Sequence, residues 1–214
     1  PNVIPELLEM LEIKGCIITM DALGTQKKLA ETIVKQEADY IMAVKEKQGY
    51  LKKRLEGVFR NQKPDSVDTA IEKGHGRLET RTCEMINTLN FFDVKEQWTG
   101  LKSLARITAQ REIRNNLTTE VRIYISSVVA DAKEFNFFIR QHWGVENSLH
   151  WTLDVTFRED AQRKRNGKAA QNFSMVQKIA LNLLKKEESK RMSIKNKRLM
   201  AAWDNEFLMR ILLI

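Results

Sequence analysis

The sequence predicts an α/β protein, because three hydrophobic patterns follow one another along its 214 residues. Residues 16–60 hold two short apolar runs, each followed by a helical pattern, and this order favours parallel strands with crossover helices. Residues 67–130 alternate polar and apolar side chains, as antiparallel strands do. Residues 132–213 repeat apolar side chains at helical spacing. We therefore expect a partial α/β core, an antiparallel β insertion and C-terminal helices.

The α/β part places a carboxylate at a strand end. Residues 16–20 are a β-branched run of strand length, and Asp21 follows directly. Thr25 is a candidate N-cap for the next helix. A second strand is expected at residues 40–44, before a helix at about 50–60. Asp21 therefore falls at the carboxyl end of a parallel strand, where α/β sheets bind ligands and metals.

The β insertion carries a stripe of charged residues. Arg77, Glu79 and Arg81 alternate along one expected strand, so their side chains point to the same face. Either they form an ion-pair ladder at the surface, or the arginines contact phosphate. The strands of the insertion are expected at residues 67–72, 77–86, 104–113 and 120–128.

The remaining elements are expected to be helical. Residues 4–11 have the spacing of a short amphipathic helix, and helix resumes near residue 132. Residues 154–160 are expected to leave the helix, because β-branched side chains cluster there. Two further helices are expected at about 169–184 and 199–213. The first of these is expected to bury Met175, Ile179, Leu181, Leu183 and Leu184.

The stretch from residue 142 to residue 154 concentrates reactive side chains. His142, Glu146 and His150 stand at i, i+4 and i+8, so they share one face of a continuous α-helix. A helical carboxylate that meets a strand-end carboxylate supplies the oxygen ligands that a hard divalent cation needs. Asp21 and Glu146 are therefore the candidate pair. Trp143 and Trp151 fit core packing better than base stacking.

The positive charge gathers near the C-terminus. The chain carries a net charge of +8, and residues 161–200 alone carry +10. This asymmetry indicates a surface for a polyanion, most simply nucleic acid. A solvated helix surface is the other interpretation. The basic residues are Arg163, Lys164, Arg165, Lys168, Lys178, Lys185, Lys186, Lys190, Arg191, Lys195, Lys197 and Arg198.

Several classes of protein are unsupported. No apolar run has the length of a membrane span and no signal peptide opens the sequence, so cytoplasmic residence without a membrane partner is expected. Cys16 and Cys83 lack metal-ligand spacing and are expected to be reduced structural residues. No glycine-rich phosphate loop is present, so nucleotide-dependent chemistry has no support.

Four segments resemble the bacterial insertion-sequence transposases of the DDE type, and most closely the H-repeat-associated transposase family. The similarity runs from near Ile4 to about Leu184, and the stretch around Glu146 is its most specific part. The segments are residues 18–26 (ITMDALGTQ), 38–45 (ADYIMAVK), 75–81 (HGRLETR) and 140–160 (RQHWGVENSLHWTLDVTFRED).

The resemblance implies an RNase H-like catalytic domain that is interrupted by a β insertion. In that family three acidic residues hold two Mg²⁺ or Mn²⁺ ions, and Asp21 matches the second and Glu146 the third. The implied reaction is attack of water, then of a liberated 3′-hydroxyl, on phosphodiesters at the element's ends. The implied partner is double-stranded DNA, as terminal inverted repeats and target DNA, and the resemblance allows a homodimer in a synaptic complex.

The sequence departs from the family's pattern in three respects. The family's first acidic residue and its early strands are expected to lie upstream of residue 4, outside this chain. His142 and Leu153 stand where related transposases often have arginine and lysine, with Asp154 next along. The loop at residues 45–48 carries lysine where the family usually shows asparagine.

Three functional hypotheses follow: a DDE transposase, a catalytically inactive DNA-binding remnant, and an RNase H-like nuclease. The expected parts are a core at residues 1–63, the β insertion at 64–131, a helix with the acidic residue at 132–160, and a basic helical region at 161–214. His142, His150 and Asp154 are candidates for supporting the metal ligands. The candidate DNA contacts are Arg77, Arg81, Arg140, Arg158, Arg163, Lys164, Arg165 and Lys168.

Overall fold

The structure, a computed structural model, describes residues 3–74, 77–89, 97–114 and 116–213, and of Glu146 and Asn147 it describes the backbone. His75 and Gly76, from the third segment of the resemblance, lie outside the described residues. The chain divides into two compact units, Pro1–His142 and Trp143–Ile214. Each unit has its own set of elements and is described by itself.

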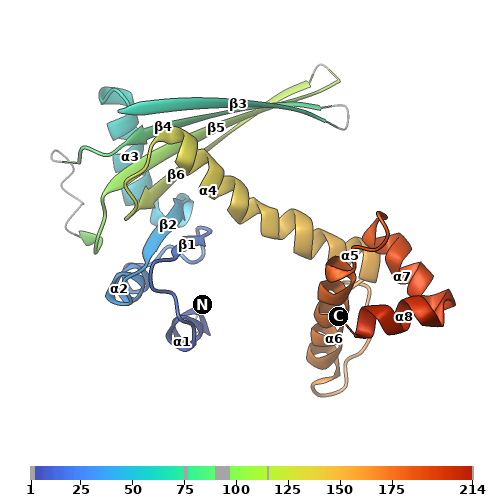
Figure 1. The fold of residues 1–214 in the computed structure, drawn as a ribbon. Coiled ribbons are helices and arrows are strands. Elements are labelled where there is room, and N and C mark those ends of the chain that lie inside the picture. Colours follow the sequence, from blue (N-terminus) through green and yellow to red (C-terminus); the bar gives the residue numbers. More distant parts are fainter. Residues whose placement is uncertain (1–2, 75–76, 90–96, 115, 214) are drawn as a thin grey trace. The chain divides into compact units, whose positions relative to one another are not determined.

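Among the described residues, the strands of the first unit form one mixed sheet in the order β1-β2-β6-β5-β4-β3 (Figure 1). β1 and β2 are parallel, as the sequence predicted, and every other neighbouring pair is antiparallel. The α/β class is thereby confirmed. The strands expected as an insertion continue the same sheet, because β6 pairs with β2. The strands are β1 (Ile17–Met20), β2 (Asp39–Val44), β3 (Ser66–Gly74), β4 (Arg77–Ile86), β5 (Ser103–Ile113) and β6 (Asn116–Ser126).

Three helices, α1 (Val3–Met10), α2 (Lys27–Lys35) and α3 (Gly49–Asn61), pack into one core on one face of the sheet (Figure 1). Ile33 and Leu55, from the second and third helices, are fully buried there. The helices meet side chains that alternate along the strands. The strand residues of this core are Tyr40, Met42, Val44, Ile86, Leu104, Ile123 and Ile125.

The opposite face is covered by α4 (Ala132–Val145). Phe135 packs edge-on against Tyr124 of β6, with ring centroids 6.0 Å apart. Asn136 donates a hydrogen bond to Asp68 of β3 at 2.9 Å. Because α1 to α3 lie on the other face, the first unit has a sheet between two helical layers.

The second unit is helical throughout its regular elements as far as the structure describes it. A π-helical turn (Glu146–His150) joins α4 to α5 (Trp151–Phe157). Leu184, Phe207 and Ile211 form its buried cluster. None of the described helices in either unit is both long enough and apolar enough to cross a membrane. The later helices are α6 (Ala169–Lys186), α7 (Ile194–Trp203) and α8 (Asn205–Leu212).

Three predictions for the second unit are wrong. Residues 154–157 remain helical, and the chain leaves the helix at Arg158, whose φ of 54° is left-handed. The expected C-terminal helix is two helices, because Asp204 accepts a hydrogen bond from the Phe207 N–H and starts α8. Met175 and Ile179 are 58% and 54% exposed. Leu181 and Leu184 of the same predicted set are buried, as expected.

Both cysteines are free, as expected. Cys16 is exposed, so it is not a core residue. Cys83 is buried in β4, and its burial raises the pKa of the thiol to about 12. The Cys83 thiol is therefore protonated and unreactive at neutral pH.

Candidate functional site

Asp21 is the first residue after β1, and its side chain is exposed. The Leu23 N–H donates to Asp21 Oδ1 at 3.0 Å, which closes a short turn on the carboxylate. The Gly24 N–H donates to the main-chain oxygen of Asp21, also at 3.0 Å. The turn therefore orients one carboxylate oxygen and leaves the group open to solvent, where it could bind a cation.

The turn after Asp21 closes tightly on the strand that precedes it. A Cβ on Gly24 would lie 3.0 Å from Met20 Sδ and 3.1 Å from Met20 Cβ. Such distances are shorter than ordinary van der Waals contacts, and the Cβ of Met20 cannot move without moving β1. Alanine at position 24 would therefore force Met20 or the turn to shift by a few tenths of an ångström.

Thr25 ties the same turn to the neighbouring strand. Its side chain is 4% exposed, and its hydroxyl lies within hydrogen-bond distance of two carbonyl oxygens, those of Ala43 and Asp21. The Ala43 oxygen, on β2, is the closer acceptor. The prediction that Thr25 caps α2 is wrong: Gln26 holds the N-cap position without a side-chain bond, because the Thr25 hydroxyl is turned toward β2.

Gln48 reaches the turn from the loop that follows β2. It ends a short 3₁₀ turn (Glu46–Gln48), and its Nε2 donates to Ala22 O at 3.1 Å and to Thr25 O at 3.2 Å. Its Oε1 accepts from the Lys45 N–H at 3.3 Å. One side chain thus joins the loops at the carboxyl ends of the two parallel strands.

His142 brings α4 to the same strand. Its Nδ1 lies 2.9 Å from Thr19 Oγ1, and the ring is half-buried. Burial lowers the pKa of the imidazole, and Arg122 adds to this effect, whereas the Asp21 carboxylate opposes it. His142 is therefore mostly neutral at pH 7, and its ring can act as a hydrogen-bonding group rather than as a cation.

The predicted continuous α-helical face of His142, Glu146 and His150 is wrong. A π-helical turn has bonds from i to i+5, so Glu146–His150 rotates the residues that follow it. Turns of this kind are frequent at functional sites. The backbone of Glu146 begins the turn, and its side chain lies outside the described part of the structure. Asp21 and Glu146 belong to different units.

Other side chains of the stretch face solvent within the second unit. His150 and Asp154 are exposed, so neither has a buried supporting role there. Trp151 is 59% exposed, and the expectation that it packs in a core is wrong. Trp143 is half-buried, in keeping with a packing role.

The described residues contain no group of three or more His, Cys, Asp or Glu side chains that could hold a metal ion. At the carboxyl end of β1 the Asp21 carboxylate is an exposed hard oxygen ligand. This donor matches the chemistry of Mg²⁺ or Mn²⁺. One carboxylate does not hold two cations, so a complete site needs further ligands.

Two residues of the charged stripe on β4 form an ion pair that is buried. Arg81 pairs with Glu79, and both side chains are largely covered. Burial alone would raise the pKa of Glu79, yet Arg81, with Arg111 and Arg77, holds that pKa below its ordinary value. Arg140 pairs with Glu72 at 2.9 Å, and Arg77 is exposed.

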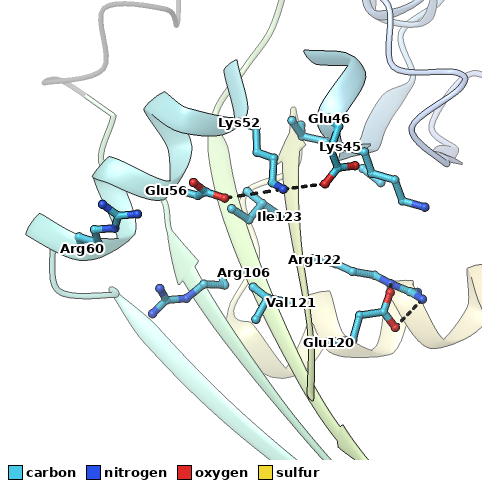
Figure 2. A pocket seen from close by; sticks show the side chains of 12 residues that line it. Lys45, Glu46, Lys52, Glu56, Arg60, Arg106, Glu120, Val121, Arg122 and Ile123 are labelled. Atoms are coloured by element: carbon cyan, nitrogen blue, oxygen red, sulfur yellow. Dashed lines mark hydrogen bonds and ion pairs between the residues drawn. The ribbon is translucent and has the colours of Figure 1, made fainter. Parts of the chain in front are cut away.

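A pocket of about 460 Å³ opens between α3 and strands β5 and β6 (Figure 2). Its charged residues are mostly paired with one another. Lys52 lies 2.8 Å from Glu46, and Arg122 lies 2.7 Å from Glu120. Glu46 belongs to the 3₁₀ turn that carries Gln48, so this pair joins the turn to α3. The lining of the pocket is therefore largely a set of ion pairs.

The basic region of the second unit is exposed almost throughout. Eleven of its twelve lysines and arginines have exposed side chains, including Arg163, Lys164 and Arg165. Lys197 is the exception, because it is buried and donates to Leu184 O at 3.2 Å. Arg158, an expected DNA contact outside this region, is also exposed.

Sequence reasoning missed Thr19, Thr25 and Gln48 as parts of this site. Their roles come from contacts between loops at neighbouring strand ends, which no residue spacing encodes. The rule that loops converge at the carboxyl ends of parallel strands was the available signal. It indicates the place, but it does not identify the side chains.

Comparison with known proteins gives one family. Residues 1–183 match the model of the family described as "Transposase DDE domain". The chain is 43% identical over 218 residues to "Putative transposase YncI" of Escherichia coli O157:H7. The aligned region covers 98% of this chain and 56% of the relative. The chain is 42% identical over 221 residues to "H repeat-associated putative transposase YhhI" of Escherichia coli K12, with 98% and 58% covered. The chain thus spans less than three-fifths of the length of these two relatives.

Proposed function

The chain belongs to the DDE transposase family, and from this membership we propose that it carries two metal-binding carboxylates, Asp21 and Glu146, on an RNase H-like core. The whole protein would cleave and transfer DNA strands at the ends of an insertion sequence. The observation that carries the proposal is the exposed Asp21 carboxylate, which a fixed turn holds at the carboxyl end of β1.

Mg²⁺ or Mn²⁺, when bound, would stabilise the attacking and leaving oxygens of a phosphodiester. Asp21 would supply one ligand from the strand end, with Oδ1 oriented by the Leu23 N–H. Glu146 would supply another from the start of the π-helical turn. His142, neutral and bonded to Thr19, would help to keep α4 in register with β1.

The proposed substrate is double-stranded DNA. Support comes from the exposed basic side chains of the second unit, because polyphosphate binding needs an accessible positive surface. Arg77 is a further exposed candidate, whereas Arg81 and Arg140 already pair with carboxylates. A contact from either paired arginine to phosphate would require that it leave its partner.

The test uses the full-length parent protein and DNA that carries its terminal inverted repeats, with Mg²⁺ present. Asp21→Asn and Glu146→Gln should each slow cleavage by about 100-fold or more, because a metal supplies several kcal/mol of transition-state stabilisation. The matched control is Glu188→Gln, which removes an exposed carboxylate of the second unit. An unchanged cleavage rate in either test variant would remove that residue from the site.

A DNA-binding protein without catalysis is a second candidate, and the +10 charge of residues 161–200 favours it. It differs from the first in one outcome: the unsubstituted parent binds the terminal repeats but cleaves nothing with Mg²⁺ or Mn²⁺. An RNase H-like nuclease would cleave without joining strands. Assaying joined products beside cleaved products therefore separates all three.

A further inference from the structure

We infer that Gln48 and Thr25 are positioning residues for Asp21. They hold the turn that follows β1 against the end of β2, so that the Asp21 carboxylate keeps one orientation. The metal-binding part of this inference rests on the proposed function. The positioning part rests on the hydrogen bonds of the first unit alone.

The Gln48 side chain spans the turn. Its two amide hydrogens go to the carbonyls of Ala22 and Thr25, at 3.1 and 3.2 Å. These carbonyls lie on either side of Leu23, whose N–H orients the Asp21 carboxylate. The side-chain amide can adopt only this orientation, because both acceptors are carbonyls and the group facing its Oε1 is an N–H.

Thr25 ties the same turn to β2 through a buried hydrogen bond. Its hydroxyl meets the Ala43 carbonyl on β2 and is almost fully buried. A buried hydroxyl of this kind is costly to remove, because the carbonyl that it satisfied would be left without a donor. The turn is thus held at two points. The Thr25 hydroxyl bonds to β2, and the Gln48 side chain bonds to two carbonyls of the turn.

The loop that carries Gln48 has its own support. Glu46, at the start of the 3₁₀ turn, pairs with Lys52 on α3 at 2.8 Å (Figure 2). The Lys52 hydrogen bond holds the pKa of the Glu46 carboxyl below its usual range. This pair is exposed and contributes little stability. The Oε1 of Gln48 also accepts from the Lys45 N–H, so the side chain is joined to the start of its own loop.

Orientation matters because a metal ligand must be held close to its productive geometry. Loss of a group that orients a ligand typically lowers metal affinity by 10- to 100-fold. The Leu23 N–H is a group of this kind, and the hydrogen bonds of Gln48 fix the backbone on either side of it. We accordingly assign Gln48 and Thr25 a positioning role and not a catalytic one.

The first experiment measures hydrogen exchange at the Leu23 and Gly24 amides of the 214-residue chain. Gln48→Ala should accelerate exchange at both by about tenfold, since two hydrogen bonds to the turn are lost. Gln110→Ala, which removes an exposed glutamine of β5, should leave both amides unchanged. Should Gln48→Ala fail to fold, Gln48→Glu keeps the acceptor for the Lys45 N–H and loses both donors. Unchanged exchange in the folded variant overturns the positioning role.

The second experiment titrates the chain with Mn²⁺ and follows paramagnetic broadening of the Leu23 amide signal. Gln48→Ala and Thr25→Val should raise the Mn²⁺ midpoint by about tenfold, and Thr25→Ser, which keeps the hydroxyl, should restore it. Faster exchange with an unchanged Mn²⁺ midpoint overturns the metal-binding part of the inference. Broadening that persists in Asp21→Asn contradicts the proposed function instead, and the exchange result then decides the positioning role by itself.

Discussion

The imidazole Nδ1 of His142 lies 2.9 Å from the hydroxyl oxygen of Thr19, on the strand that ends at Asp21. This contact joins α4 to β1, and burial there lowers the pKa of the ring. Asp21, which favours the charged ring, does not offset the burial. A neutral histidine is thus part of the folded first unit.

The stability of the chain should therefore fall as the pH drops below 6.5, the ordinary pKa of histidine. Above this pH His142 is neutral in both states, whereas below it the unfolded chain binds the proton first. Urea unfolding at pH 7.5 and 5.5 measures the change. His142→Gln, which does not titrate, should lose stability less steeply over this range. An imidazole that titrates at or above 6.5 by NMR would contradict the prediction.

Gly24→Ala should destabilise the chain by about 1–3 kcal/mol, because the added methyl group overlaps Met20. Gly57→Ala is the matched control. A Cβ at position 57 meets open space on α3, so alanine there should be neutral or stabilising by up to about 1 kcal/mol. The free energy of unfolding in urea compares the two. Equal effects would show that the turn after Asp21 can widen.

The sequence allowed the parallel pair of strands and the position of Asp21 to be predicted, because β-branched runs and helical periodicity are local signals. It misplaced the cap of α2, since the Thr25 hydroxyl bonds to Ala43 across the sheet. Local preference for a cap is worth about 1 kcal/mol, and a buried tertiary hydrogen bond can outweigh it.

The same limit explains the errors in the second unit. β-branched residues at positions 154–157 were expected to end the helix, but Thr152 and Leu153 are buried beside them and hold α5 together. Propensity is a weak signal where tertiary packing decides. The π-helical turn at Glu146–His150 has no sequence signature of its own, so the continuous helical face could not be corrected in advance.

Glu79→Gln should cost on the order of 3 kcal/mol, because it leaves the buried Arg81 without its nearest carboxylate. Glu120→Gln removes an exposed partner of Arg122 and should cost less than about 1 kcal/mol. Urea unfolding measures both variants. The wild type should also weaken as the pH falls below 4.5, where Glu79 loses its charge in the unfolded state first, and Glu79→Gln should make this dependence less steep. An equal loss in the free energy of unfolding for the two variants would mean that the Glu79–Arg81 pair is not desolvated.

Replacing Arg163, Lys164 and Arg165 with alanine should weaken DNA binding and flatten its salt dependence. All three side chains are exposed, so each can meet a phosphate. Each lost phosphate contact lowers the slope of log K against log salt by about 0.9, so the triple variant should lose about 2–3 units. Fluorescence anisotropy with duplex DNA at several salt concentrations measures the slope.

The control removes the same charge from exposed lysines of the first unit, and its slope should stay within error of the wild type. An equal loss in both variants would mean that DNA responds to the net charge of the chain and not to this segment. The control residues are Lys14, Lys28 and Lys35.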